Sequence, residues 1–149
     1  MATTNVYLTF NGNCEEAFLF YKAVFDREFT YIGRFKDIPS NDECEVDAAE
    51  AEKIMHVCLP ISTETMLMGS DTTEKMGWVD FGDNFAISIN TDSREEADHF
   101  FIELSKEGVI KMPLQKTFWG AHFGQFKDKF GINWMINFDE PETITMPLE

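Results

Sequence analysis

Hydrophobic and polar residues alternate in two short stretches of the chain, at residues 5–11 (NVYLTFN) and 84–90 (NFAISIN). Alternation with a period of two predicts β-strands that have one apolar face. The apolar faces consist of Val6, Leu8 and Phe10 in the first stretch and of Phe85, Ile87 and Ile89 in the second. We expect these faces to pack against helices. The opposite faces carry smaller or polar residues and suit the wall of a pocket.

A helical pattern follows each of these strands. Residues 13–25 (NCEEAFLFYKAVF) and 92–104 (DSREEADHFFIEL) share the sequence Glu-Glu-Ala near their start, and apolar side chains then recur at helical spacing. The candidate N-cap residues are Asn13 or Cys14 in the first helix and Asp92 or Ser93 in the second. Because the helix dipole favours glutamate in the first turn, the pattern predicts two helices with equivalent starts.

Each predicted helix is followed by three more strand patterns. They lie at residues 28–35, 53–61 and 64–70 in the first half and at 109–118, 121–128 and 132–138 in the second. Both halves, about 4–71 and 83–139, therefore have the order β-α-β-β-β. A repeat this small cannot bury its own sheet face, which predicts one domain over residues 1–149 in which the halves pack together. Aligning the halves places His56 opposite His122.

An acidic segment at residues 37–52 interrupts the first half between its second and third strands. It contains seven acidic residues and no basic one. The segment is either a solvated loop or a lid over a pocket, and its sequence leaves both interpretations open. Residues 47–53 (DAAEAEK) within and just after it predict a short helix.

The whole chain carries 12 Lys and Arg against 27 Asp and Glu, a net charge of −15. This charge repels phosphate backbones and anionic lipids, so we expect neither a nucleic-acid partner nor a membrane partner. It would suit a cationic small molecule, although solubility alone accounts for it. No signal-peptide or membrane-spanning pattern is seen. The cysteines, Cys14, Cys44 and Cys58, show no disulfide or zinc spacing, which favours a cytoplasmic location.

Three segments carry a resemblance to a known family: residues 7–25, residues 53–61 with LMGSD at 67–71, and residues 112–138. In these segments the chain resembles the vicinal-oxygen-chelate superfamily, which includes glyoxalase I, bleomycin-resistance proteins and dioxygenases. Within it, the chain is similar to the PhnB-like proteins. The resemblance implies an α+β fold in which tandem βαβββ repeats form a curved mixed sheet around a pocket. It also implies a small-molecule ligand and a homodimer that completes the pocket.

The superfamily usually holds a divalent metal with His or Glu on the first and fourth strand of each half. The positions that the resemblance assigns to these ligands are Asn5 or Val6, Met66 or Met68, Asn84 or Phe85, and Met135. Amides and thioethers are weak or poor ligands for such an ion. We therefore expect no metal site and no cofactor, because His56 and His122 without a carboxylate are too few.

The predicted lining of the pocket consists of Tyr7, Thr9, His56, Cys58, Met68, Ser88, Trp119, His122, Trp134 and Met135. Aromatic and thioether side chains suit an apolar or planar ligand. His56 is the best candidate for a catalytic base or a ligand hydrogen-bonder. It shares a strand face with Cys58, which leaves open either a Cys–His nucleophile or a buried thiol. Asp128 is expected to be structural in a hairpin turn at 128–131, and Arg34 to pair with the acidic segment.

These residues predict a protein that binds a small molecule in an apolar, aromatic pocket without the usual metal. The alternative is a metal-dependent lyase, isomerase or dioxygenase-like enzyme that uses His56. PhnB-like proteins often carry a 3-demethylubiquinone methyltransferase label, which we rank last because no Gly-rich loop opens a helix after a strand. Whether the chain is catalytic, which ligand it binds and whether a dimer exchanges halves stay open.

Overall fold

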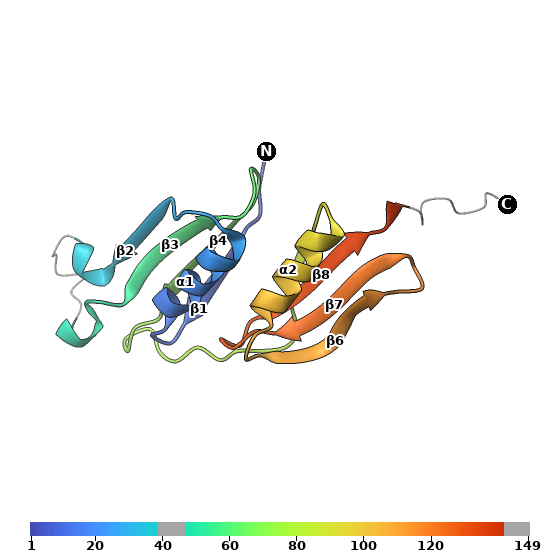
Figure 1. Cartoon of the computed structure of the whole chain (residues 1–149). Coiled ribbons are helices and arrows are strands. Elements are labelled where there is room, and N and C mark those ends of the chain that lie inside the picture. Colours follow the sequence, from blue (N-terminus) through green and yellow to red (C-terminus); the bar gives the residue numbers. More distant parts are fainter. Residues whose placement is uncertain (39–46, 142–149) are drawn as a thin grey trace. The chain divides into compact units, whose positions relative to one another are not determined.

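The computed structural model describes residues 1–38 and 47–141, and its strands form two four-stranded sheets (Figure 1). The chain divides into two compact units, Met1–Asp80 (unit 1) and Phe81–Glu149 (unit 2). Each unit orders its elements β-α-β-β-β, apart from short 3-10 turns, and each sheet carries one α-helix. The predicted α+β fold with tandem βαβββ repeats is therefore confirmed.

Unit 1 contains five main elements: β1 (Val6–Phe10), α1 (Cys14–Phe25), β2 (Tyr31–Arg34), β3 (Ile54–Pro60) and β4 (Met66–Asp71). Two 3-10 turns, η1 (Phe35–Asp37) and η2 (Ala48–Glu50), lie between β2 and β3. The strand order is β1-β4-β3-β2, in which β1 and β4 are parallel and the other pairs are antiparallel. The η2 turn falls within the helix predicted from residues 47–53.

Unit 2 repeats this arrangement with β5 (Ile87–Asn90), α2 (Arg94–Leu104), β6 (Val109–Lys116), β7 (Ala121–Lys127) and β8 (Asn133–Asp139). Its strand order is β5-β8-β7-β6, with β5 parallel to β8. Strand β5 is shorter than the predicted stretch 84–90, because the chain joins the sheet only at Ile87. Phe85 was predicted to lie on the helix-covered face. It precedes the strand and is 59% exposed, so that prediction is wrong.

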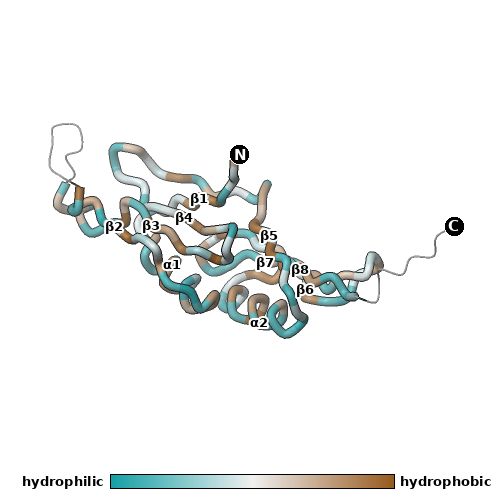
Figure 2. The backbone as a smooth tube through the Cα atoms, turned by 90° about the horizontal axis from the view of Figure 1, so that it is seen from above, coloured by the Kyte–Doolittle hydropathy of each residue, from teal (hydrophilic) through white to brown (hydrophobic). Residues whose placement is uncertain are grey.

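Each helix packs on one face of its own sheet, as Figure 2 shows for both units. In unit 1, Phe18 of α1 contacts Phe10 edge to face at 6.2 Å between ring centroids. In unit 2, Phe101 of α2 contacts Phe126 in the same way at 5.2 Å. Leu8 and Phe10 are buried, which confirms the predicted inner face of the first strand. No α-helix among the described residues of either unit covers the opposite face of its sheet, which is called the uncovered face below.

One glycine in unit 1 permits the close approach of helix and sheet. A Cβ on Gly69 of β4 would lie 2.6 Å from the Phe18 ring. Any larger residue there would force Phe18 out of its position in the core. The small residue in the motif LMGSD is therefore required by helix packing.

The two helices begin differently. Ser93 caps α2, since its side chain accepts a hydrogen bond from the backbone N–H of Glu96 at 3.1 Å. Asn13 occupies the N-cap position of α1 but makes no side-chain cap bond. The carboxylate of Asp71, at the end of β4, accepts the hydrogen bond from Cys14 instead. Unit 1 thus caps its helix from the neighbouring sheet.

The hairpin turn between β7 and β8 is organised by Asp128. Its carboxylate accepts hydrogen bonds from the backbone N–H groups of Phe130 and Ile132 and from Nε1 of Trp134 at 2.8 Å. Gly131 has a φ of +92°, the left-handed conformation that glycine tolerates. The structural role predicted for Asp128 is confirmed.

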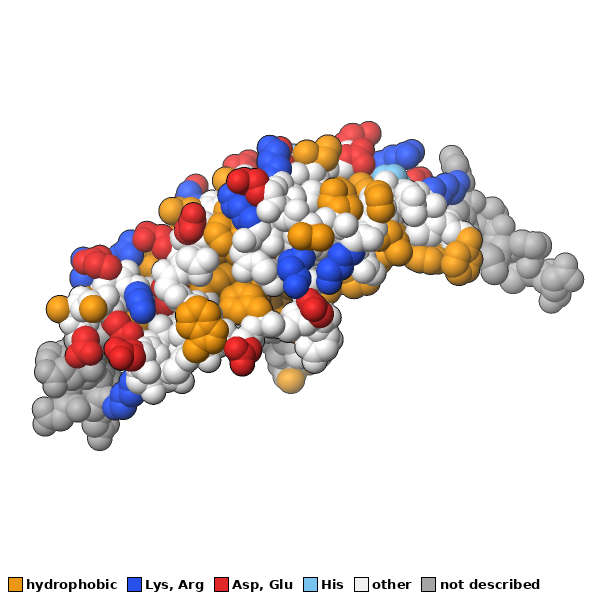
Figure 3. Space-filling model, turned by 90° about the horizontal axis from the view of Figure 1, so that it is seen from below, with side chains coloured by type: hydrophobic (Ala, Val, Ile, Leu, Met, Phe, Trp, Pro, Cys, Tyr) orange, Lys and Arg blue, Asp and Glu red, His pale blue; other side chains and the backbone are white. Residues whose placement is uncertain are grey.

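Several sequence predictions lie partly or wholly outside the described residues. Cys44 and residues 39–46 of the acidic segment are among them. Within the described residues, no helix is long and apolar enough to cross a membrane. Acidic and basic side chains are interspersed with apolar ones on the face seen in Figure 3.

Candidate functional site

The uncovered face of the unit 1 sheet gathers half of the predicted pocket residues. Strand pairing aligns Tyr7 with Met68, Met68 with Cys58, and Cys58 with Tyr31, so one row of side chains crosses all four strands. Thr9 and His56 lie on the same face by strand alternation. The structure therefore brings together the predicted residues Tyr7, Thr9, His56, Cys58 and Met68.

The imidazole of His56 lies between two tyrosine rings on this face. Tyr7 stacks on it, with 5.7 Å between ring centroids and an interplanar angle of 21°. The Tyr7 hydroxyl is also hydrogen-bonded to Nδ1 of His56 at 3.2 Å. Tyr31 lies on the other flank at 5.8 Å and 36°. Both tyrosines are nearly half exposed, which leaves a flat aromatic surface available for contact.

Gly33 leaves the space on the sheet surface that the Tyr31 ring occupies. A Cβ at Gly33 would be 2.9 Å from the Cζ atom of Tyr31, so the ring covers the glycine. Gly33 is also paired with His56 across the two strands. The sequence analysis missed Tyr31, although the Tyr-x-Gly spacing on a predicted strand is a signal that could have found it.

The Cys58 thiol contacts Met66, whereas the sequence suggested His56 as its partner. Its Sγ is directed at Sδ of Met66 at 3.2 Å, and the residue is 8% exposed. Nδ1 of His56 is engaged by Tyr7. The contacts therefore favour the buried-thiol interpretation of Cys58 over the Cys–His nucleophile.

In unit 2 the face opposite α2 holds Ser88 and Met135, which are paired across β5 and β8. The Trp119 ring contacts Phe123 of β7 at 5.9 Å and Phe118 at 4.9 Å. Trp119 is 53% exposed. Ser88, Met135 and the aromatic cluster of Trp119 and Phe123 thus belong to unit 2.

His122 lies on the opposite, helix-covered face of unit 2, so its assignment to the pocket lining is corrected. Its side chain is 8% exposed, and Nε2 lies 3.4 Å from Oδ1 of Asp98 on α2. The buried Nδ1 has no hydrogen-bond partner among the described residues.

The wrong placement of His122 comes from a one-residue error in the sequence alignment of the two halves. Leu59 pairs with Leu67 in unit 1, and Phe126 pairs with Trp134 in unit 2. Counting back from these pairs, the counterpart of His56 is Phe123. A shift of one residue turns a strand side chain to the other face of the sheet. The histidines of the two halves therefore do not correspond.

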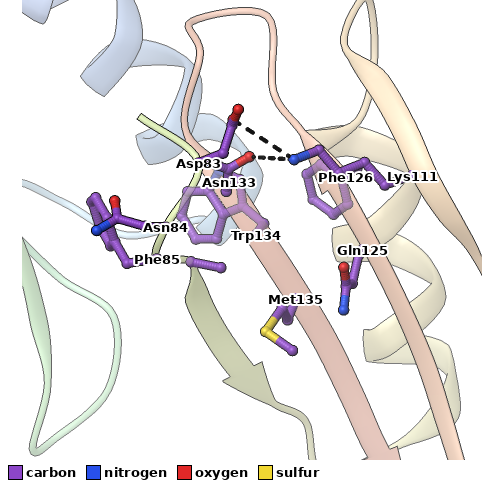
Figure 4. Close-up of a pocket in the computed structure, with 10 residues that line it drawn as sticks. Asp83, Asn84, Phe85, Lys111, Gln125, Phe126, Asn133, Trp134 and Met135 are labelled. Carbon is purple, nitrogen blue, oxygen red and sulfur yellow. Dashed lines mark hydrogen bonds and ion pairs between the residues drawn. The ribbon is translucent and has the colours of Figure 1, made fainter. Parts of the chain in front are cut away.

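A cavity of about 260 Å³ lies in unit 2 beside the starts of β5 and β8 (Figure 4). Trp134 and Met135 line it, and Asp83, Lys111, Gln125 and Asn133 supply its polar groups. Lys111 Nζ lies 3.1 Å from Oδ1 of Asn133. The sequence analysis missed the charged groups, because strand pairing alone brings them together.

The residues present do not fit the superfamily's metal site. Asn84, Phe85 and Met135 line the unit 2 cavity, and they offer an amide, a phenyl ring and a thioether. Within residues 1–38 and 47–141, no three His, Cys, Asp or Glu side chains lie close enough to hold a metal ion. A divalent cation normally needs several imidazole or carboxylate ligands that converge.

Arg34 has a structural role. Its guanidinium forms a bidentate pair with Glu15 of α1, at 3.1 and 2.5 Å, and also donates to the carbonyl of Glu52 at 2.7 Å. The hydrogen bond from Arg34 lowers the pKa of Glu15. The predicted pairing with the acidic segment is seen at Glu52, while the helix partner was not expected.

The family model for 3-demethylubiquinone-9 3-methyltransferase matches residues 2–137 of this chain. The chain belongs to this family. Protein YjdN of Escherichia coli (strain K12) is 30% identical over 137 residues, which cover 88% of this chain and 91% of that protein. Both matches span the two βαβββ units.

Solved structures agree with this membership. Protein PA1353 from Pseudomonas aeruginosa is 36% identical, with a TM-score of 0.82, over 93% of this chain and 98% of that one. A PhnB protein from Bacillus cereus is 24% identical, with a TM-score of 0.72, over 92% and 99% of the two chains. The resemblance to PhnB-like proteins is thereby confirmed.

The fold extends to the wider superfamily. A glyoxylase/bleomycin resistance protein/dioxygenase domain from Frankia sp. EAN1pec is 14% identical, with a TM-score of 0.65, over 95% of this chain and 93% of that chain. At this level of identity the likeness concerns the fold alone. It agrees with the predicted fold and carries no information about the reaction.

Proposed function

We propose that this chain binds a small planar molecule on the uncovered face of the unit 1 sheet, without a metal ion. The observation that carries the proposal is the imidazole of His56 held between the rings of Tyr7 and Tyr31. A ligand stacked on these rings would gain the offset or edge contacts that aromatic groups prefer. The polar edges of the same three rings would fix its orientation.

The surroundings of the three rings support this function. Met68 and Cys58 of the row, with Met66 in contact with the Cys58 sulfur, provide a soft, polarisable floor that adapts to the shape of a ligand. Nε2 of His56 makes no hydrogen bond within the described residues, so it is free to donate to or accept from a ligand. Ligand sites commonly combine such an apolar wall with a few convergent polar groups.

The ligand that this surface favours is neutral or cationic. The net charge of −15 opposes anions at long range, although salt screens that effect. We further propose that a second copy of the chain completes the pocket, as the family resemblance implies. Sedimentation equilibrium of the purified chain tests that part separately.

The proposal is tested by NMR titration with quinoline as a neutral planar probe and benzamidine as a cationic one. We expect the largest amide shift changes at Tyr7, His56 and Tyr31. His56→Ala and Tyr31→Ala should each weaken binding about three- to tenfold, because one aromatic contact contributes about 0.5–1.5 kcal/mol. Trp78→Ala is the matched control, since Trp78 is an exposed aromatic residue of the same unit outside the site.

Tyr7→Phe separates stacking from hydrogen bonding, because it keeps the ring and removes the hydroxyl that contacts His56. We expect Tyr7→Phe to weaken ligand binding less than His56→Ala does. Shift changes confined to other parts of the chain, or equal losses in Trp78→Ala and His56→Ala, would contradict the proposal.

The alternative is a metal-dependent enzyme of the same superfamily that uses His56. Its test is the metal content of protein purified without chelator or affinity tag and then exposed to nickel, zinc, manganese or iron(II). About one retained ion per chain, lost in His56→Ala, would establish this alternative. We rank it second because no three donor groups in the described part of the chain converge as such an ion requires.

The methyltransferase activity in the family's description is ranked last. Nucleotide-type cofactors are usually held by a Gly-rich turn between a strand and a helix. The turn from β1 to α1 contains the single glycine Gly12, and the turn from β5 to α2 contains none. Neither turn offers the usual cradle for such a cofactor.

A further inference from the structure

Two lysines converge on one carboxylate at the mouth of the unit 2 cavity. Lys127, the last residue of β7, pairs with Asp83 at 2.7 Å. Lys111 of β6 lies 3.8 Å from the same oxygen and 3.1 Å from Oδ1 of Asn133 (Figure 4). In a chain with 27 acidic and 12 basic residues, this is a local excess of positive charge.

The cavity behind these lysines has room for a small molecule. Its volume is about 260 Å³, slightly below the usual range of about 300–1,000 Å³ for ligand sites, which suits a small ligand. Gln125 and Asn84 line it, and their side-chain amides make no hydrogen bond within the described residues. Met135 and the exposed ring of Phe85 provide apolar contact. Unused amides beside apolar groups are typical of a binding pocket.

Asp83 occupies the place where an anionic group of a ligand would lie. It belongs to the segment before β5, outside the sheet, and its side chain is 68% exposed. A hydrogen bond from Lys127 and the charges of Lys127 and Lys111 lower the pKa of this carboxyl. The charges of both lysines therefore act on this one position, and Asp83 lies in the segment before β5 and not in a strand.

We propose that the unit 2 cavity binds a small molecule that carries a carboxylate or phosphate group, and that this group displaces Asp83 from Lys111 and Lys127. Ammonium groups bind such anions as point charges, with charge-assisted hydrogen bonds. Asn133 holds Lys111 in place, and Gln125 and Asn84 contact the rest of the ligand. Asp83 competes with the ligand for Lys111 and Lys127, so a weakly charged ligand does not displace it.

This site differs from the surface of the proposed function. It lies in the other unit, uses charge in place of stacking, and takes a ligand of opposite charge to the one expected there. The two proposals therefore fail independently. A purely structural ion pair that fastens residue 83 to the sheet is the competing explanation of the same contacts.

The experiment is an NMR titration of the full chain with phenyl phosphate, benzoate and inorganic phosphate, and with neutral benzamide as the matched probe. We expect the anions to shift the amide signals of Asp83, Gln125 and Asn133 and benzamide to leave them in place. Phenyl phosphate binding without benzoate binding, or the reverse, identifies which anionic group the site takes.

Three variants decide the proposal. Lys111→Met and Lys127→Met should each weaken anion binding about tenfold or more, as expected for loss of a charged hydrogen bond. Asp83→Asn should strengthen it several-fold, because it removes the competitor. Lys116→Met, on the exposed far end of β6, makes the same charge change away from the cavity and should bind as the natural chain does.

The opposite results would overturn the proposal. These are anion binding unchanged in Lys111→Met and Lys127→Met, equal shifts with benzamide, or no binding even in Asp83→Asn. Dispersed amide spectra of each variant establish that it is folded. Both lysines are partly exposed, so these substitutions leave the core of unit 2 intact.

Discussion

The carboxylate of Asp71, at the end of β4, accepts a hydrogen bond from the backbone N–H of Cys14, the first residue of α1, at 2.9 Å. The same carboxylate accepts from Gly12 at 2.9 Å and, through its other oxygen, from Ile54 at 2.9 Å. Asp71 is 1% exposed. One buried side chain thus joins the start of the helix to two strands of unit 1.

Asp71→Ala should destabilise unit 1 by about 3 kcal/mol, because it leaves the buried N–H groups of Cys14 and Ile54 and the part-buried N–H of Gly12 without this partner. Urea unfolding followed by tyrosine fluorescence and by NMR signals of unit 1 measures the change. Asp80→Ala, at an exposed position of the same unit, is the control and should change the free energy of unfolding by less than about 0.5 kcal/mol. An equal effect of the two substitutions would contradict the capping role.

The Cys14 thiol should be unreactive in the folded protein. Burial, and then the nearby negative charges of Asp71 and Glu15, raise its pKa well above the ordinary value. In a Cys44→Ser/Cys58→Ser variant, modification by a thiol reagent at pH 8 should be about 100-fold slower than in urea, because the thiolate forms only on unfolding. Rapid modification under native conditions would show that the helix start opens readily.

The pair between Arg34 and Glu15 should make stability depend on pH. Arg34 lowers the pKa of Glu15 in the folded state, so the pair contributes stability above the unfolded pKa and loses it as pH falls through the folded pKa. Arg34→Met should therefore cost more at pH 7 than at pH 3. Because both side chains are partly exposed, solvent screening limits the difference to about 0.5–1 kcal/mol.

Urea unfolding of the natural chain and of Arg34→Met at the two pH values measures this difference. Lys75→Met, at an exposed position without a recorded partner, is the matched control for loss of one positive charge. A destabilisation by Arg34→Met that is the same at both pH values would indicate that packing, and not the ion pair, is responsible.

His122→Met should leave stability within about 1 kcal/mol of the natural value, although the residue is buried. Its Nδ1 has no partner among the described residues, and Nε2 is 3.4 Å from a half-exposed Asp98. Replacing a buried polar group that is only partly satisfied by an apolar one is often neutral. Methionine is also the residue that unit 1 has at the equivalent position, Met55.

Thermal unfolding of His122→Met, with His99→Met on the exposed side of α2 as the control, tests this expectation. A loss of several kcal/mol would show that the contact with Asp98 is stronger than its distance suggests.

Local patterns in the sequence determined the elements of this protein. Alternation placed Leu8 and Phe10 on the inner face of β1, and the Ser93 cap and the Glu-Glu-Ala repeats located the helices. These features depend on neighbours within a few residues, so they can be read without knowing the fold. The family resemblance likewise rests on motifs that are contiguous in the chain.

Only the tertiary structure decided which distant residues meet. The pairing of β7 with β8 showed that Phe123, and not His122, corresponds to His56, because one residue of register reverses the face. Strand order likewise brought Tyr31 beside His56, and Lys111 and Lys127 to Asp83. These contacts form between segments far apart in sequence, so no local periodicity encodes them, and they are the ones that define both candidate sites.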